Sequence, residues 1–209
     1  MRIDRRRELT RAAILKAGQR LFAERAMDSV SIDDIVSTAE VAKGSFYNHF
    51  DDKEGLAHAI VELVQGDCEF HIFAANKGMT DAARRMVRAM CVTLRYARAH
   101  PERLQALISL SERRTIATSP LNAGVSTDVA EGLEQGVFAG VTLEVGVLIA
   151  LGIVRTAVVH VMTEAFDRPL ADLGTVVGAA LLRALGTPAD SALTIAAETT
   201  ATLLEEPTR

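Results

Sequence analysis

The apolar residues of this chain recur at helical spacing along nearly its whole length. In one segment the stripe is Leu56, Ala59, Ile60, Leu63 and Val64, a spacing of three to four residues that places all five on one helix face. The alternation that marks half-buried strands is not evident, and no internal repeat is found. With 14 glycines and 5 prolines, the chain is also poor in turn-forming residues. We therefore predict an all-α fold.

Capping residues, glycines and prolines interrupt the apolar stripes and indicate where the helices begin and end. The polar segment 115–125, which contains Pro120 and Gly124, is expected to be the main loop. The expected helices are 7–25, 31–38, 42–49, 53–75, one from 80 onward, 101–114, 126–138, 143–166, 170–185 and 188–204.

The second and third expected helices are short and are joined by a tight turn. Ser31 and Asp34 form a Ser-x-x-Asp pattern, a variant of the capping box that begins a helix. A longer helix precedes the pair. Such a three-helix unit holds its last helix rigidly enough to enter the major groove of DNA. The arrangement predicts a helix-turn-helix over residues 1–55.

The third helix has an unusual composition for a helix of the core. It offers a cation, two hydroxyls, an amide, an imidazole and a glycine, and each of these groups can contact a phosphate or the edge of a base. Phe46 and Phe50 lie four residues apart and are expected to face inward together. The side chains expected to face outward are Lys43, Tyr47 and Asn48.

The charge of the chain is unevenly distributed. The net charge is −4, which by itself argues against nucleic acid as a partner. Residues 1–25, however, carry 8 basic residues (Lys or Arg) and 3 acidic ones (Asp or Glu). Residues 26–55 carry 2 basic and 7 acidic residues. Basic charge at the N-terminus is typical of an arm and first helix that lie near phosphates.

The short helices also carry a recognisable motif. The segment from Ala39 to Phe50 reads AEVAKGSFYNHF and is followed by Lys53, Glu54 and Leu56. It closely resembles the recognition segment of the TetR family of bacterial one-component regulators, as do the upstream stretches FAE at 22–24 and VSIDDI at 30–35. The resemblance covers about the first quarter of the chain; the rest resembles the family in its helix layout.

The resemblance implies a DNA-contacting set. Its members are Ser31, Ala42, Lys43, Gly44, Ser45, Tyr47, Asn48, His49 and Lys53. Their implied roles are phosphate contacts by Ser31, Tyr47, His49 and Lys53, groove contacts by Lys43 and Ser45, close approach at Gly44, and a base or backbone contact by Asn48.

Two positions depart from the family pattern. Glu40 stands where the family has glycine, so a negative charge lies near the DNA and we expect a less positive backbone angle in the turn. Ala42 replaces a common Ser or Thr, and the missing hydroxyl removes a phosphate bond of about 1 kcal/mol.

Residues 56–209 are expected to form a larger helical domain for effector binding and dimerisation. In the resemblance, the helices at 143–166 and 170–185 pair with their copies in a four-helix bundle, which makes the protein a homodimer. Each glycine inside a helix costs roughly 1 kcal/mol against alanine. The four glycines Gly146, Gly152, Gly174 and Gly178 therefore indicate close backbone approach, or else simple tolerance in a packed core.

The resemblance further implies a small-molecule cavity between the fourth helix and those after it. Candidate lining residues are Cys68, Phe70, His71, Met90, Tyr96, Arg155, His160, Met162 and Glu164. Each has a simpler alternative: the methionines and Phe70 as core fillers, Cys68 as a small buried hydrophobe, and His160 with Glu164 as a surface pair. Scarce aromatics, 4% with no Trp, favour an aliphatic or compact effector.

Other classes of protein fit the sequence less well. Cys68-x-x-His71 supplies two metal ligands where a structural zinc site needs four, and no phosphate-binding glycine loop is present. We expect no enzyme activity, no metal and no cofactor. The two cysteines give no disulfide framework, and the N-terminus lacks a signal-peptide pattern, so we expect a cytoplasmic protein. The apolar stretch 141–161 contains Glu144 and Arg155, so we expect no membrane span.

The prediction is therefore a DNA-binding regulator, a repressor released from its operator by a small-molecule effector. The alternatives are a helical interaction module without specific DNA binding and a helical enzyme.

Overall fold

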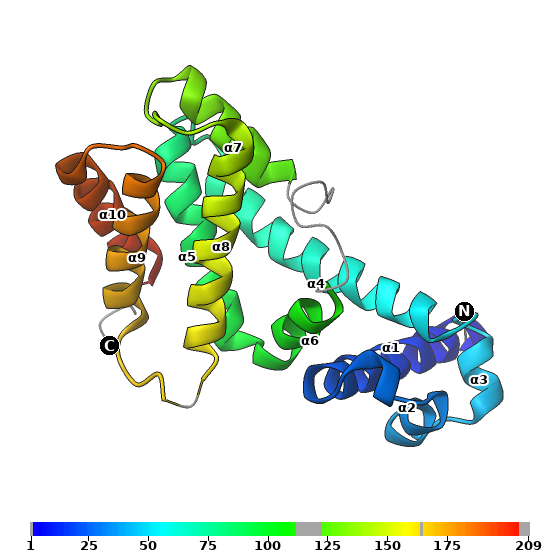
Figure 1. Cartoon of the computed structure of the whole chain (residues 1–209). Coiled ribbons are helices and arrows are strands. Elements are labelled where there is room, and N and C mark those ends of the chain that lie inside the picture. The colour runs from blue at the N-terminus through cyan, green and yellow to red at the C-terminus, as the bar shows by residue number, and fades with distance from the viewer. Residues whose placement is uncertain (1, 112–122, 164, 205–209) are drawn as a thin grey trace. The chain divides into compact units, whose positions relative to one another are not determined.

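The computed structural model describes residues 2–111, 123–163 and 165–204, and the regular elements within those ranges are all helical (Figure 1). The predicted all-α fold is confirmed. The helices are α1 (Arg2–Glu24), α2 (Ile32–Thr38), α3 (Lys43–Tyr47), α4 (Lys53–Asn76), α5 (Ala82–Ala99), α6 (Pro101–Ser111), α7 (Ala123–Glu134), α8 (Leu143–Val161), α9 (Leu170–Ala184) and α10 (Ala189–Leu204), with a 3-10 turn, η1 (Met27–Ser29), after α1.

Helices α1, α7 and α8 differ most from their expected bounds. Helix α1 begins at Arg2 instead of residue 7. Helix α7 begins at Ala123, so Gly124 and Val125, expected in a loop, are helical. It ends four residues before Phe138 because Gly136 adopts a φ of +70°, which stops the helix. Helix α8 ends at Val161 instead of residue 166. Residues 115–122 of the expected loop lie outside the described residues.

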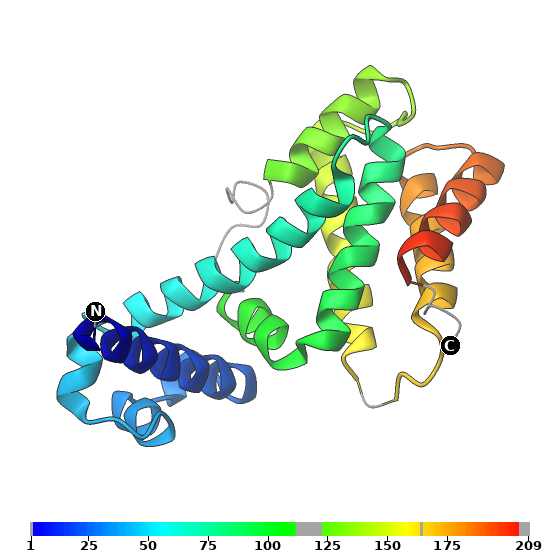
Figure 2. The same cartoon turned by 180° about the vertical axis from the view of Figure 1, so that it is seen from behind.

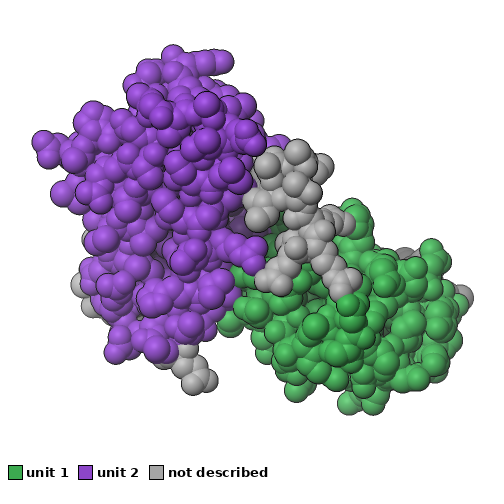
Figure 3. All heavy atoms as spheres, in the orientation of Figure 1, with its two compact units in different colours: residues 1–67, 100–114 green, residues 68–99, 115–209 purple. Residues whose placement is uncertain are grey.

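The chain divides into two compact units, coloured separately in Figure 3. The N-terminal unit comprises residues 1–67 and 100–114, and the C-terminal unit comprises residues 68–99 and 115–209. Helix α4 contributes to both, and α6 belongs to the N-terminal unit, where it packs on α1. The division at residue 55 stays a prediction, and the compact units differ from it by placing the first two-thirds of α4 with the N-terminal helices.

A small apolar core fixes the helix-turn-helix within the N-terminal unit. Phe22 of α1, Ile35 of α2, Phe46 of α3 and Leu56 of α4 are all fully buried. Gly18 lets α1 and α4 approach closely, since a methyl group at this position would lie 2.8 Å from Ile60 Cδ1. The third helix is thus held from several sides by apolar contacts.

Helix α5 is the central element of the C-terminal unit and packs against α7, α8, α9 and α10 (Figures 1 and 2). An ion-pair cluster ties it to α7. Arg85 donates from Nε to Asp128 Oδ1 at 2.7 Å and from Nη2 to Glu131, and it also donates to the carbonyl of Thr80 at 3.1 Å. Burial of this arginine is compensated by its carboxylate partners, as buried charge requires.

Three of the four glycines named above in α8 and α9 permit close packing inside the subunit. A methyl group on Gly146 would lie 2.7 Å from Val129 of α7, and one on Gly174 would lie 2.6 Å from Leu204 of α10. Gly178 likewise faces α5 and α10. Gly152 has no heavy atom within 4 Å of such a methyl group. The close approach that the sequence indicates is therefore found within one chain at three of these four positions.

Helix α8 has one face against the rest of the subunit and one face that is open. Its buried residues include Val147, Ala150 and Val158, whereas Val145 and Leu148 are exposed. Among the described residues it is the one helix long and apolar enough to cross a membrane by length and composition, and 33% of that window is buried. Core helices pass the same test, so this carries little weight.

Candidate nucleic-acid interface

A capping box fixes the start of α2, as the sequence predicts. The Ser31 hydroxyl oxygen accepts from the Asp34 amide at 3.1 Å, and Asp34 Oδ2 accepts from the Ser31 amide at 2.9 Å. The bond from the Ser31 backbone holds the pKa of the Asp34 carboxyl below its usual value, with help from the Ser31 hydroxyl and Arg25. The cap sets the angle at which α2 leads into the turn and α3.

The turn between α2 and α3 contains a strained residue. Glu40 has a φ of +55°, the left-handed region that glycine adopts without cost. This φ is positive but smaller than the 70° to 94° of the four described glycines with positive φ, so the expectation of a less positive angle is not contradicted. The amide of Val41 donates to the carbonyl of Val36 at 3.0 Å, which closes the turn tightly and demands the glycine-like angle whatever residue is present.

Helix α3 is anchored by aromatic side chains and exposes its polar ones. Phe46 and Phe50 are buried with ring centroids 5.8 Å apart, as predicted. Half of the Tyr47 side chain is accessible, and its ring meets the edge of Phe46 at 5.5 Å. The exposed residues of this segment are Ala42, Lys43, Gly44, Tyr47 and Asn48, and Ser45 and His49 are half-buried. The predicted inward and outward faces are confirmed.

Two positions on α3 bear on how DNA would approach. A methyl group on Gly44 would meet no protein atom within 4 Å, so the space beside its backbone is open. Lys43 Nζ lies 2.8 Å from Asp33 Oδ1 of α2, and this hydrogen bond raises the pKa of the lysine. Both partners are exposed, so the pair is weak and can exchange for a phosphate.

Lys53 lies differently from the other implied contacts. Its ammonium donates to the carbonyl of Met27 at 2.7 Å and to that of Val30 at 2.8 Å. These bonds join the first turn of α4 to the connection between α1 and α2. Two of the three ammonium donors are therefore committed to backbone carbonyls, which favours a positioning role for this lysine.

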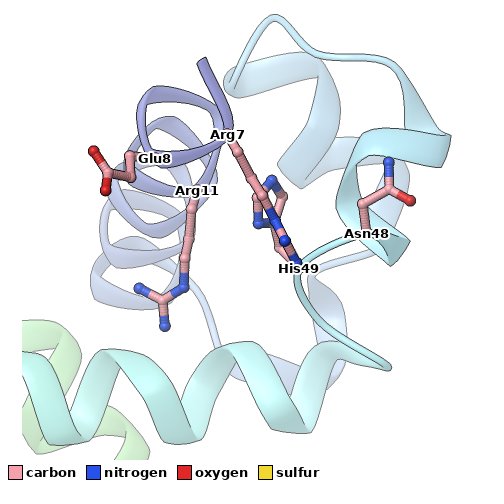
Figure 4. Close-up of a pocket in the computed structure, with 5 residues that line it drawn as sticks. All are labelled: Arg7, Glu8, Arg11, Asn48 and His49. Atoms are coloured by element: carbon pink, nitrogen blue, oxygen red, sulfur yellow. The ribbon is translucent and has the colours of Figure 1, made fainter. Parts of the chain in front are cut away.

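An open hollow of about 350 Å³ lies where the N-terminal half of α1 passes the end of α3 (Figure 4). It is lined by Arg7, Glu8, Arg11, Asn48 and His49. Burial lowers the pKa of His49, and the nearby Arg7 and Arg11 lower it further. Asn48 and His49 belong to the predicted contact set. Beyond the basic charge of residues 1–25, no motif pointed to Arg7 and Arg11.

The expected effector-pocket residues differ in how far they are buried. Cys68, Met90 and Tyr96 are buried. Phe70, His71, Arg155 and His160 are exposed, Met162 is half-buried, and Glu164 with its predicted pairing lies outside the described residues. Met90 fills the core between α5 and α9, since its Cε would lie 3.3 Å from a methyl group on Gly178. The His71 ring lies 6.1 Å from the Tyr96 ring, which brings two of the candidates together. The effector pocket stays a prediction.

Comparison with known proteins agrees with this geometry. Residues 14–60 match the family model described as bacterial regulatory proteins, tetR family. The HTH-type transcriptional repressor DhaR of Mycobacterium sp. (strain GP1) is 31% identical over 127 residues, which is 61% of this chain and 61% of DhaR. The chain thus aligns with about three-fifths of the length of that relative.

Solved structures share the fold over most of the chain. A TetR family transcription regulator from Marinobacter aquaeolei VT8 aligns with a TM-score of 0.72 at 17% identity, covering 90% of this chain and 100% of that one. RolR in complex with the ligand resorcinol aligns with a TM-score of 0.60 at 23% identity, covering 92% of this chain and 95% of RolR. At these identities the likeness shows the fold.

Proposed function

The chain belongs to the tetR family of bacterial regulatory proteins, and from this premise we propose that it is a sequence-specific DNA-binding repressor that a small-molecule effector releases from its operator. The observation that carries the proposal is α3, whose buried Phe46 holds Lys43, Tyr47 and Asn48 on an exposed face. The similarity to the repressor DhaR supports the direction of regulation.

The proposed DNA-contacting residues fall on one short stretch around α3. They are Ser31, Ala42, Lys43, Gly44, Ser45, Tyr47, Asn48 and His49, with Lys53 assigned to holding the start of α4 in place. Such a set sorts into phosphate contacts, which position the protein, and contacts to base edges, which give specificity. Asn48 is the residue we assign to a base edge, because its amide can pair with adenine.

We further propose that the protein acts as a homodimer through α8. Its open face carries Val145, Leu148 and Val159, each more than 40% exposed, together with the open Gly152. An unpaired apolar stripe along a helix is typical of an interface. The α3 helices of the two subunits, about one DNA turn (~34 Å) apart, then bind the two half-sites of one operator. A regulator of this kind binds chromosomal DNA, so we place it in the cytoplasm.

The dimer is tested by Leu148→Glu on α8 against Leu193→Glu on α10, where leucine is also exposed. We expect sedimentation equilibrium to give a monomer for Leu148→Glu and a dimer for Leu193→Glu. A dimer in both variants contradicts this interface.

DNA binding is tested by fluorescence anisotropy of the purified protein on its own upstream promoter fragment across a salt series. We expect tight binding that weakens steeply with salt, as counterion release requires. The double variant Lys43→Ala/Tyr47→Ala is expected to lose binding with its helical circular dichroism unchanged.

A helical interaction module or a helical enzyme predicts instead that Lys43→Ala/Tyr47→Ala leaves function intact. If neither the promoter fragment nor a selection over genomic DNA yields a preferred duplex, the regulator proposal fails. We expect no catalytic activity, because the polar residues of α3 are explained by DNA.

An effector is supported by the fold, since RolR, which shares it, was solved with resorcinol bound. We propose a compact or aliphatic effector for this chain. Compounds that raise the thermal midpoint are expected also to release the duplex, because a ligand shifts the balance only through its different affinity for the two states.

A further inference from the structure

The hollow between α1 and α3 gathers positive charge next to the proposed DNA-reading helix. Arg7 and Arg11 lie one turn apart on α1 and line it together with His49. Figure 4 shows Arg7 beside the imidazole of His49, with the Glu8 carboxylate pointing to the other side of α1. Arg11 also rests over the Phe50 ring at 5.3 Å, which fixes one wall of the hollow. Two guanidinium groups and an imidazole thus share one space.

The surroundings of His49 disfavour a positive charge on its imidazole. Burial, followed by the two arginines, lowers the pKa of His49, so protonation is harder than in a free side chain. Within the part of the chain whose side chains are described, neither Arg7 nor Arg11 forms an ion pair. An anion in the hollow relieves the repulsion among the positive charges of Arg7, Arg11 and a protonated His49.

We propose that this hollow, the Arg7–His49 pocket, binds a backbone phosphate of duplex DNA and that His49 is protonated when the phosphate is bound. The inference rests on the proposed function. Arginine matches phosphate with paired N–H donors, and protonated imidazole adds a charged donor. Asn48 lines the pocket and is exposed at the C-terminal end of α3, so the pocket adjoins the proposed DNA-reading helix.

Proton uptake gives the pocket a measurable signature. The charged groups around His49 are Arg7, Glu8 and Arg11 of α1, and α3 contributes the neutral amide of Asn48. The pKa of His49 lies below 6.5 in the free protein, and a phosphate beside it raises that pKa. The complex therefore binds more protons than its parts, and affinity for DNA increases as the pH falls between the two values. Each unit of difference corresponds to about a tenfold change in affinity.

The first experiment measures operator affinity by anisotropy between pH 5.5 and 8 at constant ionic strength. His49→Gln is expected to abolish most of the pH dependence. His58→Gln is the matched control, because His58 lies on α4 beside Glu62 and outside the pocket, and it is expected to keep that dependence. Equal pH dependence in His49→Gln and the wild type overturns the proton uptake.

The second experiment measures the salt dependence of affinity in Arg7→Gln and Arg11→Gln, with Lys16→Gln as an exposed cation of α1 outside the pocket. Each lost phosphate contact reduces the slope of log K against log salt by about 0.9. Because both arginines face one phosphate, we expect that full reduction in the double variant Arg7→Gln/Arg11→Gln, a partial one in each single arginine variant, and less than either in Lys16→Gln. Unchanged slopes in both arginine variants contradict the pocket.

A third experiment distinguishes duplex phosphate from free phosphate by following the His49 imidazole with NMR. A rise in the pKa of His49 with operator duplex supports the proposal, whether or not inorganic phosphate also raises it. A rise with inorganic phosphate alone, or with neither, overturns it. Complete failure to bind any duplex is seen separately by anisotropy and counts against the proposed function.

Discussion

Lys53 offers the sharpest test of how the DNA-reading unit is built. Replacement by methionine keeps the apolar stem of the side chain and removes its two hydrogen bonds to the carbonyls of Met27 and Val30. A hydrogen bond with a charged donor contributes about 1.5–3 kcal/mol. The site is half-buried, so water replaces part of the loss, and we take the low end for each bond. The expected decrease in the free energy of unfolding is about 3 kcal/mol.

Thermal unfolding followed by circular dichroism measures that decrease. In a chain of this length each kcal/mol lowers the midpoint by roughly 2–4 °C, so Lys53→Met is expected to unfold about 6–12 °C lower. Lys43→Met is the matched control. Its ammonium pairs with Asp33 at the surface, so its midpoint is expected to stay near that of the wild type.

Anisotropy across a salt series then separates positioning from phosphate contact. A lysine that binds a phosphate contributes about 0.9 to the salt slope, whereas a positioning lysine contributes nothing to it. We expect Lys53→Met to weaken binding with an unchanged slope, and Lys53→Arg, which keeps the charge, to weaken it as well. A slope reduced by about 0.9 in Lys53→Met with an unchanged midpoint would refute the reasoning and restore the phosphate contact.

Three further changes test other parts of the structure. In Glu40→Gly the left-handed angle no longer costs the roughly 1–2 kcal/mol that it costs a residue with a side chain. Glycine loses about 0.5–1 kcal/mol more chain entropy on folding, so we expect a slightly higher unfolding midpoint, and a lower one contradicts the strain. Gly174→Ala places a methyl group 2.6 Å from Leu204 and is expected to lower the free energy of unfolding in urea by about 1–3 kcal/mol. Gly66→Ala, in open space on α4, is the control and is expected to raise it by up to about 1 kcal/mol; the reverse order refutes the packing. Burial raises the pKa of Cys91 to about 12, so this thiol is expected to resist alkylation at pH 8 until urea unfolds the chain, as mass spectrometry will show; rapid labelling of folded protein contradicts the burial.

Much of the DNA-reading unit follows from local rules. The capping pattern of Ser31 and Asp34 predicts where α2 begins, and the four-residue spacing of Phe46 and Phe50 predicts which side of α3 is buried. Both depend only on residues within one turn of each other. The left-handed angle at Glu40 depends on the closure of the turn by the Val41–Val36 hydrogen bond more than on the preference of the residue.

Features that depend on distant parts of the chain were predicted less well. Gly174 and Gly178 signalled close approach correctly, but only the placement of α10 and α5 shows which neighbour approaches. Arg7 and Arg11 carried no motif, and their role rests on α1 passing the end of α3. The same holds for Lys53, whose partners lie 26 and 23 residues earlier in the chain.

The electrostatics of the reading unit favour selective over indiscriminate binding. Residues 26–55 contain 7 acidic and only 2 basic side chains, and both lysines already have partners inside the protein, Lys43 at Asp33 and Lys53 at two carbonyls. Among the residues whose side chains the structure describes, Arg7 and Arg11 are the cations that line the hollow beside α3, and neither forms an ion pair. Since non-specific affinity for DNA is almost entirely electrostatic, this unit is expected to bind random duplex weakly. Tight binding then requires a duplex whose base edges fit α3 at the same time as a phosphate enters the Arg7–His49 pocket.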